Sequence, residues 1–140
     1  MAIGVMENSR MWLTAAQLSL GKGIYTIALY SAEMATEMAL KGVLQALKTD
    51  VPKAHNITAQ IRAILEANGN RLPKEFLDNE SLILGTFRAL VDLRPQVGYI
   101  HEGKIDEKRI ESQAKEYVKN AGYIVRLCDK AIAYIGKGQK

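Results

Sequence analysis

One stretch of this chain, residues 30–47 with the sequence YSAEMATEMALKGVLQAL, most constrains what it can fold into. Wound into a helix, this stretch is apolar in nearly every direction and has one narrow polar stripe. Mostly small residues recur at helical spacing along one side, namely Ile24, Ala28, Ser31, Ala35, Met38, Gly42 and Ala46. Because small side chains let a second backbone come close, we predict a central helix with tightly packed neighbours on several sides.

The polar stripe of this helix consists of Glu33, Glu37 and Lys41, spaced four residues apart. Residues at that spacing stack on one face, and glutamate four residues before lysine has the favourable orientation for an ion pair. Spacing alone therefore favours a structural Glu37–Lys41 salt bridge. The alternative is that Glu37 and Lys41 face a site and bind a nucleotide.

Composition is that of a globular protein with one domain, residues 1–140, which is long enough to bury a core. The single cysteine, Cys128, excludes a disulfide framework and predicts a buried structural thiol in a reducing compartment. The net charge of +4 permits nucleic-acid or nucleotide binding without requiring it.

Two further sequence features concern location. No apolar run approaches the roughly 18 residues that span a bilayer. The N-terminal residues also lack the basic start and apolar run of a signal peptide. We therefore expect a cytoplasmic protein with no membrane segment.

Apolar periodicity predicts five helices and no strand, over residues 5–20, 24–48, 56–68, 73–93 and 106–135. The three prolines, at positions 52, 73 and 95, fall where this pattern breaks. Long helices joined by short turns predict an all-α, up-and-down bundle of four to five helices.

Several helix ends have recognisable residues. Asn56 and Asp106 are suitable N-caps, and Asn68-Gly69 is typical of a left-handed helix end. Whether Asp78-Asn79 interrupts the fourth helix stays open. Residues 136–140 are expected to form a frayed tail.

Candidate chemistry is sparse. The two histidines, His55 and His101, lie in different turns, and neither has a second ligand at metal spacing. We therefore expect no metal and no cofactor, and the chain has no phosphate-binding glycine loop. His55 precedes an apolar helix, where its imidazole is expected to bond to the backbone.

The loop that begins at Arg94 and continues to His101, RPQVGYIH, places a guanidinium and an imidazole at two ends of a constrained turn. Such a pair suits cleavage of RNA without a metal. Histidine can take a proton from the 2′-hydroxyl or give one to the leaving 5′-oxygen, and arginine can hold the phosphate. The alternative, which spacing alone favours, is that Arg94 caps a helix and His101 lies on a surface loop.

The segment Tyr30–Lys41 resembles the second helix of HEPN domains (higher eukaryotes and prokaryotes nucleotide-binding), whose motif is an alanine-rich aliphatic run ending in Glu-x-x-x-Lys. The turn at residues 54–57, Ala-His-Asn-Ile, is similar to a His-Asp-Leu-like element that follows this helix in the family. The first helix with Trp12, the arginine near position 94 and the long last helix also occur in the expected order. The resemblance covers residues 11–134.

This resemblance implies a helical bundle that commonly forms homodimers and is named for inferred nucleotide binding. Many HEPN domains are metal-independent ribonucleases, including toxins, and carry an arginine, four to six intervening residues and a histidine. Arg94 and His101 match that spacing at its upper limit. The implied catalytic residues are therefore Arg94 and His101, in one RNA cleft composed from two subunits.

Other residues would assist in that cleft. The resemblance implies that Lys41, Lys104 and Lys108 steer phosphate and that Tyr99 stacks on a base. Pro95 stands where active members have a polar residue, and Gly103 where many have tyrosine. An arginine followed by proline is closer to the nucleotidyltransferase-associated, prokaryotic branch. The alternative function is therefore a non-catalytic nucleotide-binding or interaction module that partners a minimal nucleotidyltransferase.

Overall fold

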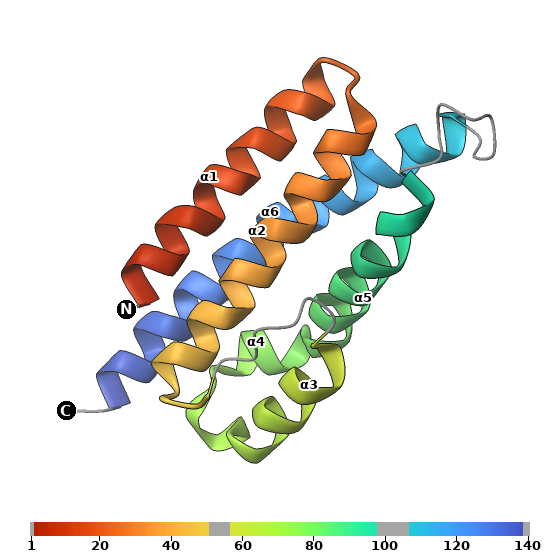
Figure 1. Ribbon diagram of the computed structural model, residues 1–140. Helices are drawn as coiled ribbons and strands as arrows, with labels where there is room; N and C mark the ends of the chain where they lie inside the picture. Colours follow the sequence, from red (N-terminus) through yellow and green to blue (C-terminus); the bar gives the residue numbers. More distant parts are fainter. Residues whose placement is uncertain (1, 51–56, 98–106, 139–140) are drawn as a thin grey trace.

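The computed structural model describes residues 2–50, 57–97 and 107–138, excepting the side chains of residues 2, 3 and 94–97. These ranges form six α-helices, one short 3-10 helix and no strand, which confirms the all-α prediction (Figure 1). The elements are α1 (Ala2–Gly21), α2 (Tyr25–Ala46), α3 (Thr58–Ala67), η1 (Gly69–Arg71), α4 (Lys74–Asp78), α5 (Glu80–Val97) and α6 (Glu107–Gly138).

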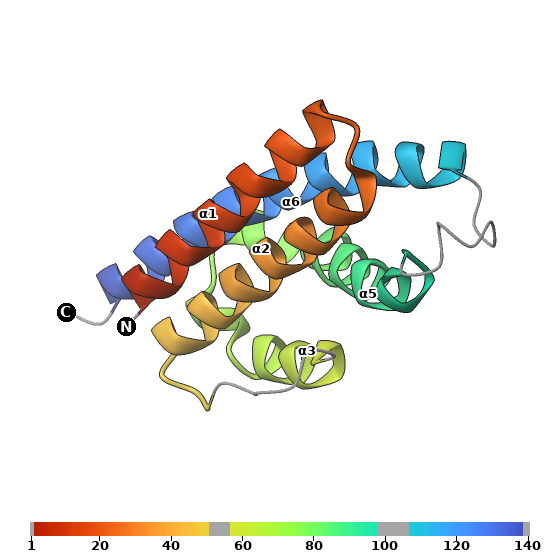
Figure 2. The same ribbon diagram turned by 45° about the horizontal axis from the view of Figure 1, so that its top comes forward.

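The long helices run alternately up and down, with α2 at the centre (Figures 1 and 2). Helix α2 packs against α1, α5 and α6, while the short helices α3 and α4 lie at one end of the bundle. In this arrangement α5 ends, and α6 and α2 begin, at the opposite end. Arg94 belongs to that end of the bundle, in the last turn of α5, whereas His101 lies outside the described residues.

The close approach of α1 to α2 depends on small residues, as predicted. A Cβ added to Gly42 would lie 2.8 Å from Met6 Sδ of α1. Ser9 Oγ donates a 2.7 Å hydrogen bond to the backbone oxygen of Ala35. Ile24, which was placed on the same face, is instead 46% exposed, because it precedes the helix in the α1–α2 turn.

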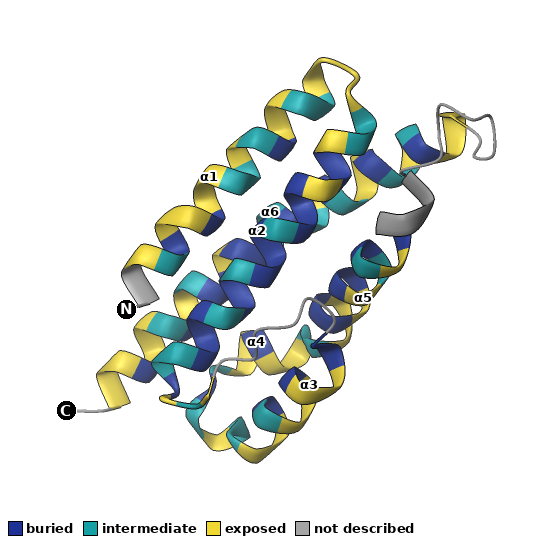
Figure 3. Cartoon of the chain, viewed as in Figure 1, coloured by how far each residue is buried: buried dark blue, intermediate teal, exposed yellow. Residues whose placement is uncertain are grey.

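The buried residues, dark blue in Figure 3, line the inner sides of the helices. They form two clusters. One cluster gathers α3, α4 and the first half of α5 around residues 35–47 of α2. The other joins Leu90 and Leu93 of α5 to Leu29 of α2 and Ile110 of α6. Cys128 is fully buried, and burial raises the pKa of its thiol well above the ordinary value, so the prediction of a structural thiol is confirmed.

Three sequence-based helix ends were wrong. Helix α5 continues through Pro95 to Val97 instead of ending before the proline. Asn68 has φ −117° and leads into η1, so the expected left-handed end does not form there. Helix α6 extends to Gly138, so residues 136–138 of the expected frayed tail are helical.

The open question at Asp78-Asn79 is settled by a break at Asn79, which separates α4 from α5 and raises the helix number from five to six.

Helix α3 begins at Thr58 with Ile57 in the N-cap position, so the prediction of Asn56 as its N-cap was wrong. The expected N-cap Asp106 lies outside the described residues, as does His55. The left-handed helix end occurs instead at Lys48, which has φ 60° and follows α2. Backbone N–H groups of Lys48 and Thr49 donate to the oxygens of Gln45 and Leu44, as in a Schellman motif. Glycine is the usual residue in that position, because a Cβ is strained at positive φ.

Replacing Lys48 by glycine is therefore expected to stabilise the protein by about 1 kcal/mol, because it relieves this backbone strain. Thermal and urea unfolding measure the change. The Lys48→Ala variant is the control, since it removes the same charge and keeps the Cβ. Equal stability of the two variants would contradict this explanation.

Candidate functional site

The structure describes four of the seven sequence-predicted site residues and places these four in two groups. Arg94 lies in the last turn of α5 and Lys108 in the first turn of α6. Tyr99, His101 and Lys104 belong to the connection between these helices and lie outside the described residues. Glu37 and Lys41 form the second group, in the middle of α2.

The end of α5 is held firmly in the bundle. Leu90 and Leu93 are buried in the same cluster as Ala28 and Leu29 of α2 and Ile110 of α6. The backbone of Arg94 directly follows Leu93 and is therefore fixed on a packed helix end. A reacting group needs such a rigid support, since small displacements lower catalytic rates steeply.

A polar network joins the beginnings of α2 and α6 at this same end. Tyr25 Oη donates a 2.8 Å hydrogen bond to Glu111 Oε1, and Lys115 Nζ donates a 3.2 Å hydrogen bond to Glu111 Oε2. The bond from Tyr25, followed by the bond from Lys115, lowers the pKa of Glu111, and the charge of Lys108 acts in the same direction. The bond to Glu111 also raises the pKa of Tyr25.

Replacing Tyr25 by phenylalanine is expected to raise the pKa of Glu111 towards its ordinary value, because the main stabilising donor is lost. A lowered folded-state pKa contributes stability above the unfolded-state pKa, and this contribution is lost as the pH falls through the folded-state value. The variant is therefore expected to lose stability less steeply on acidification. An NMR titration of the glutamate carboxyl groups measures the shift, with Tyr117→Phe as the control. An unchanged Glu111 titration in Tyr25→Phe would contradict the assignment.

A cavity of about 350 Å³ opens beside this network. Its lining residues come from the α1–α2 turn, the first turn of α2 and the first turn of α6: Gly23, Ile24, Tyr25, Thr26, Glu107 and Ile110. Its volume lies in the range of small-molecule sites. Sequence reasoning missed Tyr25 and Glu111, because no local signal links residues 86 positions apart.

The second group, Glu37 and Lys41, makes the ion pair that the spacing predicted. Lys41 Nζ donates to Glu37 Oε2 at 2.9 Å, and the side chains of Glu37 and Lys41 are 1% and 13% exposed. Glu37 follows Tyr25 by 12 residues, a rise of about 18 Å along α2. The structure therefore does not bring this pair to the end of the bundle where Arg94 and Lys108 lie.

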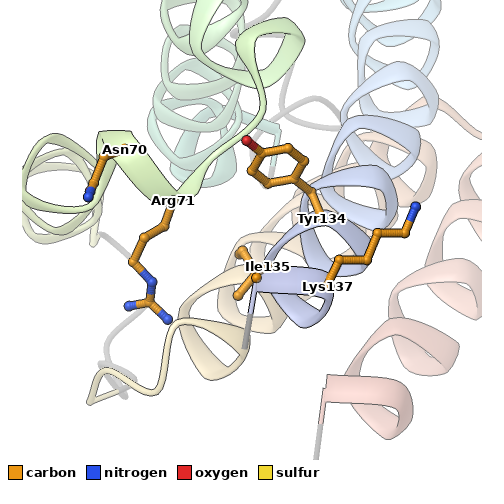
Figure 4. Close-up of a pocket in the computed structure, with 6 residues that line it drawn as sticks. Asn70, Arg71, Tyr134, Ile135 and Lys137 are labelled. Atoms are coloured by element: carbon orange, nitrogen blue, oxygen red, sulfur yellow. The ribbon is translucent and has the colours of Figure 1, made fainter. Parts of the chain in front are cut away.

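A larger cavity, of about 420 Å³, lies at the other end of the bundle between η1 and the end of α6. Arg71 there donates through Nη1 to the backbone oxygen of Leu47 and to Asn68 Oδ1, at 3.2 and 3.1 Å. The side chains of Arg71 and Lys137 point in different directions (Figure 4). This cavity therefore offers no converging pair of cations, and Arg71 serves to close the C-terminal end of α2.

Within the described part of the chain, no three His, Cys, Asp or Glu side chains are grouped to hold a metal ion. None of the helices in those ranges combines the length and apolar character needed to cross a membrane.

Comparison with known proteins gave one match, to a protein-family model. No curated protein and no solved structure matches the chain. A family model described as the HEPN domain matches residues 4–131, which include every described helix either wholly or in large part. The chain therefore belongs to the HEPN domain family.

Proposed function

We propose that this HEPN domain is a cytoplasmic, homodimeric endoribonuclease of the toxin type, in which Arg94 and His101 cleave RNA without a metal. The observation that carries the proposal is the position of Arg94 on a packed helix end. The connection that bears His101 starts directly after that helix and leads into α6. Arg94 thus belongs to the end of the bundle that also has the Tyr25–Glu111 network and its cavity.

The proposed reaction is a transesterification. His101 takes the proton of the 2′-hydroxyl, the 2′-oxygen forms a bond to phosphorus, and the bond from phosphorus to the 5′-oxygen breaks. The leaving 5′-oxygen takes a proton from a general acid, for which His101 of the partner subunit is available. Arg94 stabilises the negative charge on the phosphate oxygens. The products are a 2′,3′-cyclic phosphate and a 5′-hydroxyl end.

The remaining candidate residues assist binding in this proposal. Lys104 and Lys108 attract the phosphate backbone, and Tyr99 stacks on a base. Lys41 is left out, because it pairs with Glu37 in another part of α2.

Exposed apolar side chains of α1 and α2 support the homodimer. Met11 and Leu18 of α1 and Ile27 and Tyr30 of α2 are large apolar side chains that are at least 40% exposed. Trp12 packs edge-on against Tyr30, with ring centroids 5.8 Å apart, and so joins the two helices into one surface. Exposed apolar patches of this kind mark interaction sites, and a second copy offers the same uncharged chemistry.

We expect Ile27→Glu to convert a dimer into a monomer, because a buried, unpaired carboxylate is costly at an apolar interface. Light scattering at micromolar concentration measures the mass. The matched control is Leu77→Glu, which places the same charge at a partly exposed leucine of α4. A wild-type protein that is entirely monomeric in this assay would contradict the composite cleft.

The experiment that tests the nuclease itself is incubation of the purified protein with RNA in EDTA, with mass spectrometry of the product ends. We expect cleavage with cyclic phosphate ends by the wild type. A folded wild-type protein that leaves RNA intact would contradict the proposal.

One observation favours a second candidate function. Pro95 directly follows Arg94 and lies inside the last turns of α5. The resemblance associates this arrangement with the nucleotidyltransferase-associated branch. A non-catalytic module that binds a minimal nucleotidyltransferase would leave RNA intact, so the same cleavage assay separates the two candidates.

A further inference from the structure

Six cationic side chains form a stripe along the outer side of α6. They follow one another at intervals of seven, four, seven, four and seven residues, which keeps them on one side of an α-helix. At 1.5 Å per residue the stripe is about 44 Å long. All six residues of this basic stripe are exposed: Lys108, Lys115, Lys119, Arg126, Lys130 and Lys137.

The opposite side of α6 is buried in the core, where it includes Ile110, Ile124, Cys128 and Ile135. The stripe therefore points away from the bundle, on a helix that runs the whole length of the molecule (Figures 1 and 2). Because its apolar side is buried, α6 has no apolar face with which to enter a bilayer. A ligand of the stripe must be recognised by charge along an extended path.

The positive charge of the chain is concentrated in this stripe. The net charge of the whole chain is +4, which is less than the six charges of the stripe. The other 13 lysine and arginine residues are outnumbered by the 15 aspartate and glutamate residues. The arc of α6 that contains the six cations holds none of the acidic residues of this helix, which are Glu107, Glu111, Glu116 and Asp129. A solvated helix face usually mixes both signs, so this separation of charge indicates an anionic ligand.

Ion pairs neutralise only part of the stripe. Lys115 Nζ lies 3.2 Å from Glu111 Oε2, and the lysine side chain is 63% exposed. Lys130 Nζ lies 3.2 Å from Glu75 Oε1 of α4 and is equally accessible. Exposed pairs of this kind contribute about 1 kcal/mol or less, so a phosphate can replace the carboxylate. Within the ranges that the structure describes, three members of the stripe make no ion pair, namely Lys119, Arg126 and Lys137.

Two tyrosines, eleven residues apart, flank the stripe on one side. Arg126 Cζ lies 5.8 Å from the centroid of the Tyr123 ring, a contact that orients the guanidinium. Tyr134 is 49% exposed and, like Lys137, lines the cavity between η1 and the end of α6 (Figure 4). Unpaired bases stack on exposed aromatic rings, whereas the bases of a duplex are already stacked on each other. Cations interleaved with aromatic rings are therefore typical of surfaces that bind single strands.

We infer that the basic stripe binds the phosphate backbone of a single-stranded nucleic acid that lies along α6, with a base stacked on Tyr134. This inference goes beyond the proposed function, because it assigns a second site and needs no cleavage. The stripe begins with Lys108, at the end of the bundle to which Arg94 belongs. An RNA strand held on the stripe thus extends from that end along the outer side of the molecule.

Fluorescence anisotropy with a labelled 2′-O-methyl oligouridine of about 20 nucleotides tests the site. This probe lacks the 2′-hydroxyl that cleavage needs, so binding is measured separately from any nuclease activity. The stripe variant combines Lys119→Gln, Arg126→Gln and Lys137→Gln. We expect it to weaken binding about tenfold to a hundredfold in low salt. The slope of log K against log salt is expected to fall by about 2, since each phosphate contact on a single strand contributes roughly 0.7.

The matched control combines Lys48→Gln, Arg62→Gln and Arg88→Gln, which remove the same charge from exposed positions elsewhere in the bundle. We expect the control to bind nearly as tightly as the wild type. Equal losses in the two triple variants would overturn the inference, because net charge alone would then explain the attraction. If the stripe variant does not fold, its three single substitutions decide instead, with a loss of roughly threefold expected for each.

The base contact has its own readout. Tyr134→Leu is expected to weaken binding several-fold without changing the salt slope, because stacking releases no counterions. Tighter binding of a duplex than of the single strand would overturn the inference. So would stripe-dependent binding of phosphatidylserine vesicles by a protein that does not bind the oligonucleotide.

The outcomes also separate this site from the proposed nuclease. Stripe-dependent binding of the methylated strand, without cleavage of ordinary RNA by the wild type, would keep the inference and refute only the nuclease. Cleavage by the wild type, with unchanged affinity in the stripe variant, would keep the nuclease and overturn the inference.

Discussion

Replacing His101 by alanine is expected to lower the rate of RNA cleavage by about two to four orders of magnitude, the usual contribution of a general acid or base. The loss is expected in kcat rather than in KM, because in the proposed reaction the imidazole moves a proton in the transition state and adds little to ground-state binding. Quantitative cleavage of a fluorescent RNA in EDTA measures both constants.

The chain contains a matched control for this substitution. His55 is the other histidine, and it belongs to a different connection of the bundle. His55→Ala is therefore expected to leave kcat close to the wild-type value. An equal loss in both histidine variants would contradict the assignment of His101 and would indicate a general effect on folding.

Arg94 is expected to act on the same step by a different physical effect. Arg94→Ala removes charge stabilisation of the phosphate, at an expected cost of about two to three orders of magnitude in kcat. Arg94→Lys keeps the charge but loses the two-pronged hydrogen bonding, so only part of the rate is expected to return. Full activity of Arg94→Lys would show that position 94 contributes charge alone.

The second large effect concerns stability. Replacing Phe87 by alanine is expected to lower the free energy of unfolding by about 3–5 kcal/mol, because this ring is fully buried and its removal leaves a cavity in the core. For a chain of 140 residues this corresponds to a fall in Tm of roughly 10–15 °C.

The neighbouring residue is the control for this prediction. Arg88 is exposed and makes only a 3.9 Å contact with Asp92, so Arg88→Ala is expected to change stability by less than about 0.5 kcal/mol. Calorimetry of both variants compares a core and a surface position one residue apart. Similar losses would mean that α5 does not pack through Phe87.

Local patterns were sufficient to predict most of the fold. The number and order of the long helices follow from apolar periodicity, because a helix buries one side at a spacing that the sequence records directly. The Glu37–Lys41 ion pair was predictable for the same reason, since residues four apart on one helix are neighbours in any fold. The family match over residues 4–131 agrees with the resemblance first seen at Tyr30–Lys41.

Helix ends were less predictable, because they depend on packing as well as on local preference. Pro95 was expected to end α5, but the helix continues to Val97, next to Leu93, which is buried in one cluster with residues of α2 and α6. Lys48 adopts a left-handed conformation that glycine prefers, because the chain must leave α2 there with its backbone groups satisfied.

The sequence by itself determined the helical class, the faces of the helices and the motif Arg94…His101. Only the tertiary structure decided that Glu33 is buried, that Glu37 and Lys41 lie away from the end of the bundle that has Arg94, and that Tyr25 meets Glu111. The physical reason is how far apart in the sequence the interacting residues lie. Periodicity and ion pairing within a helix depend on residues a few positions apart, whereas a site at the end of a bundle combines helices that no spacing in the chain relates.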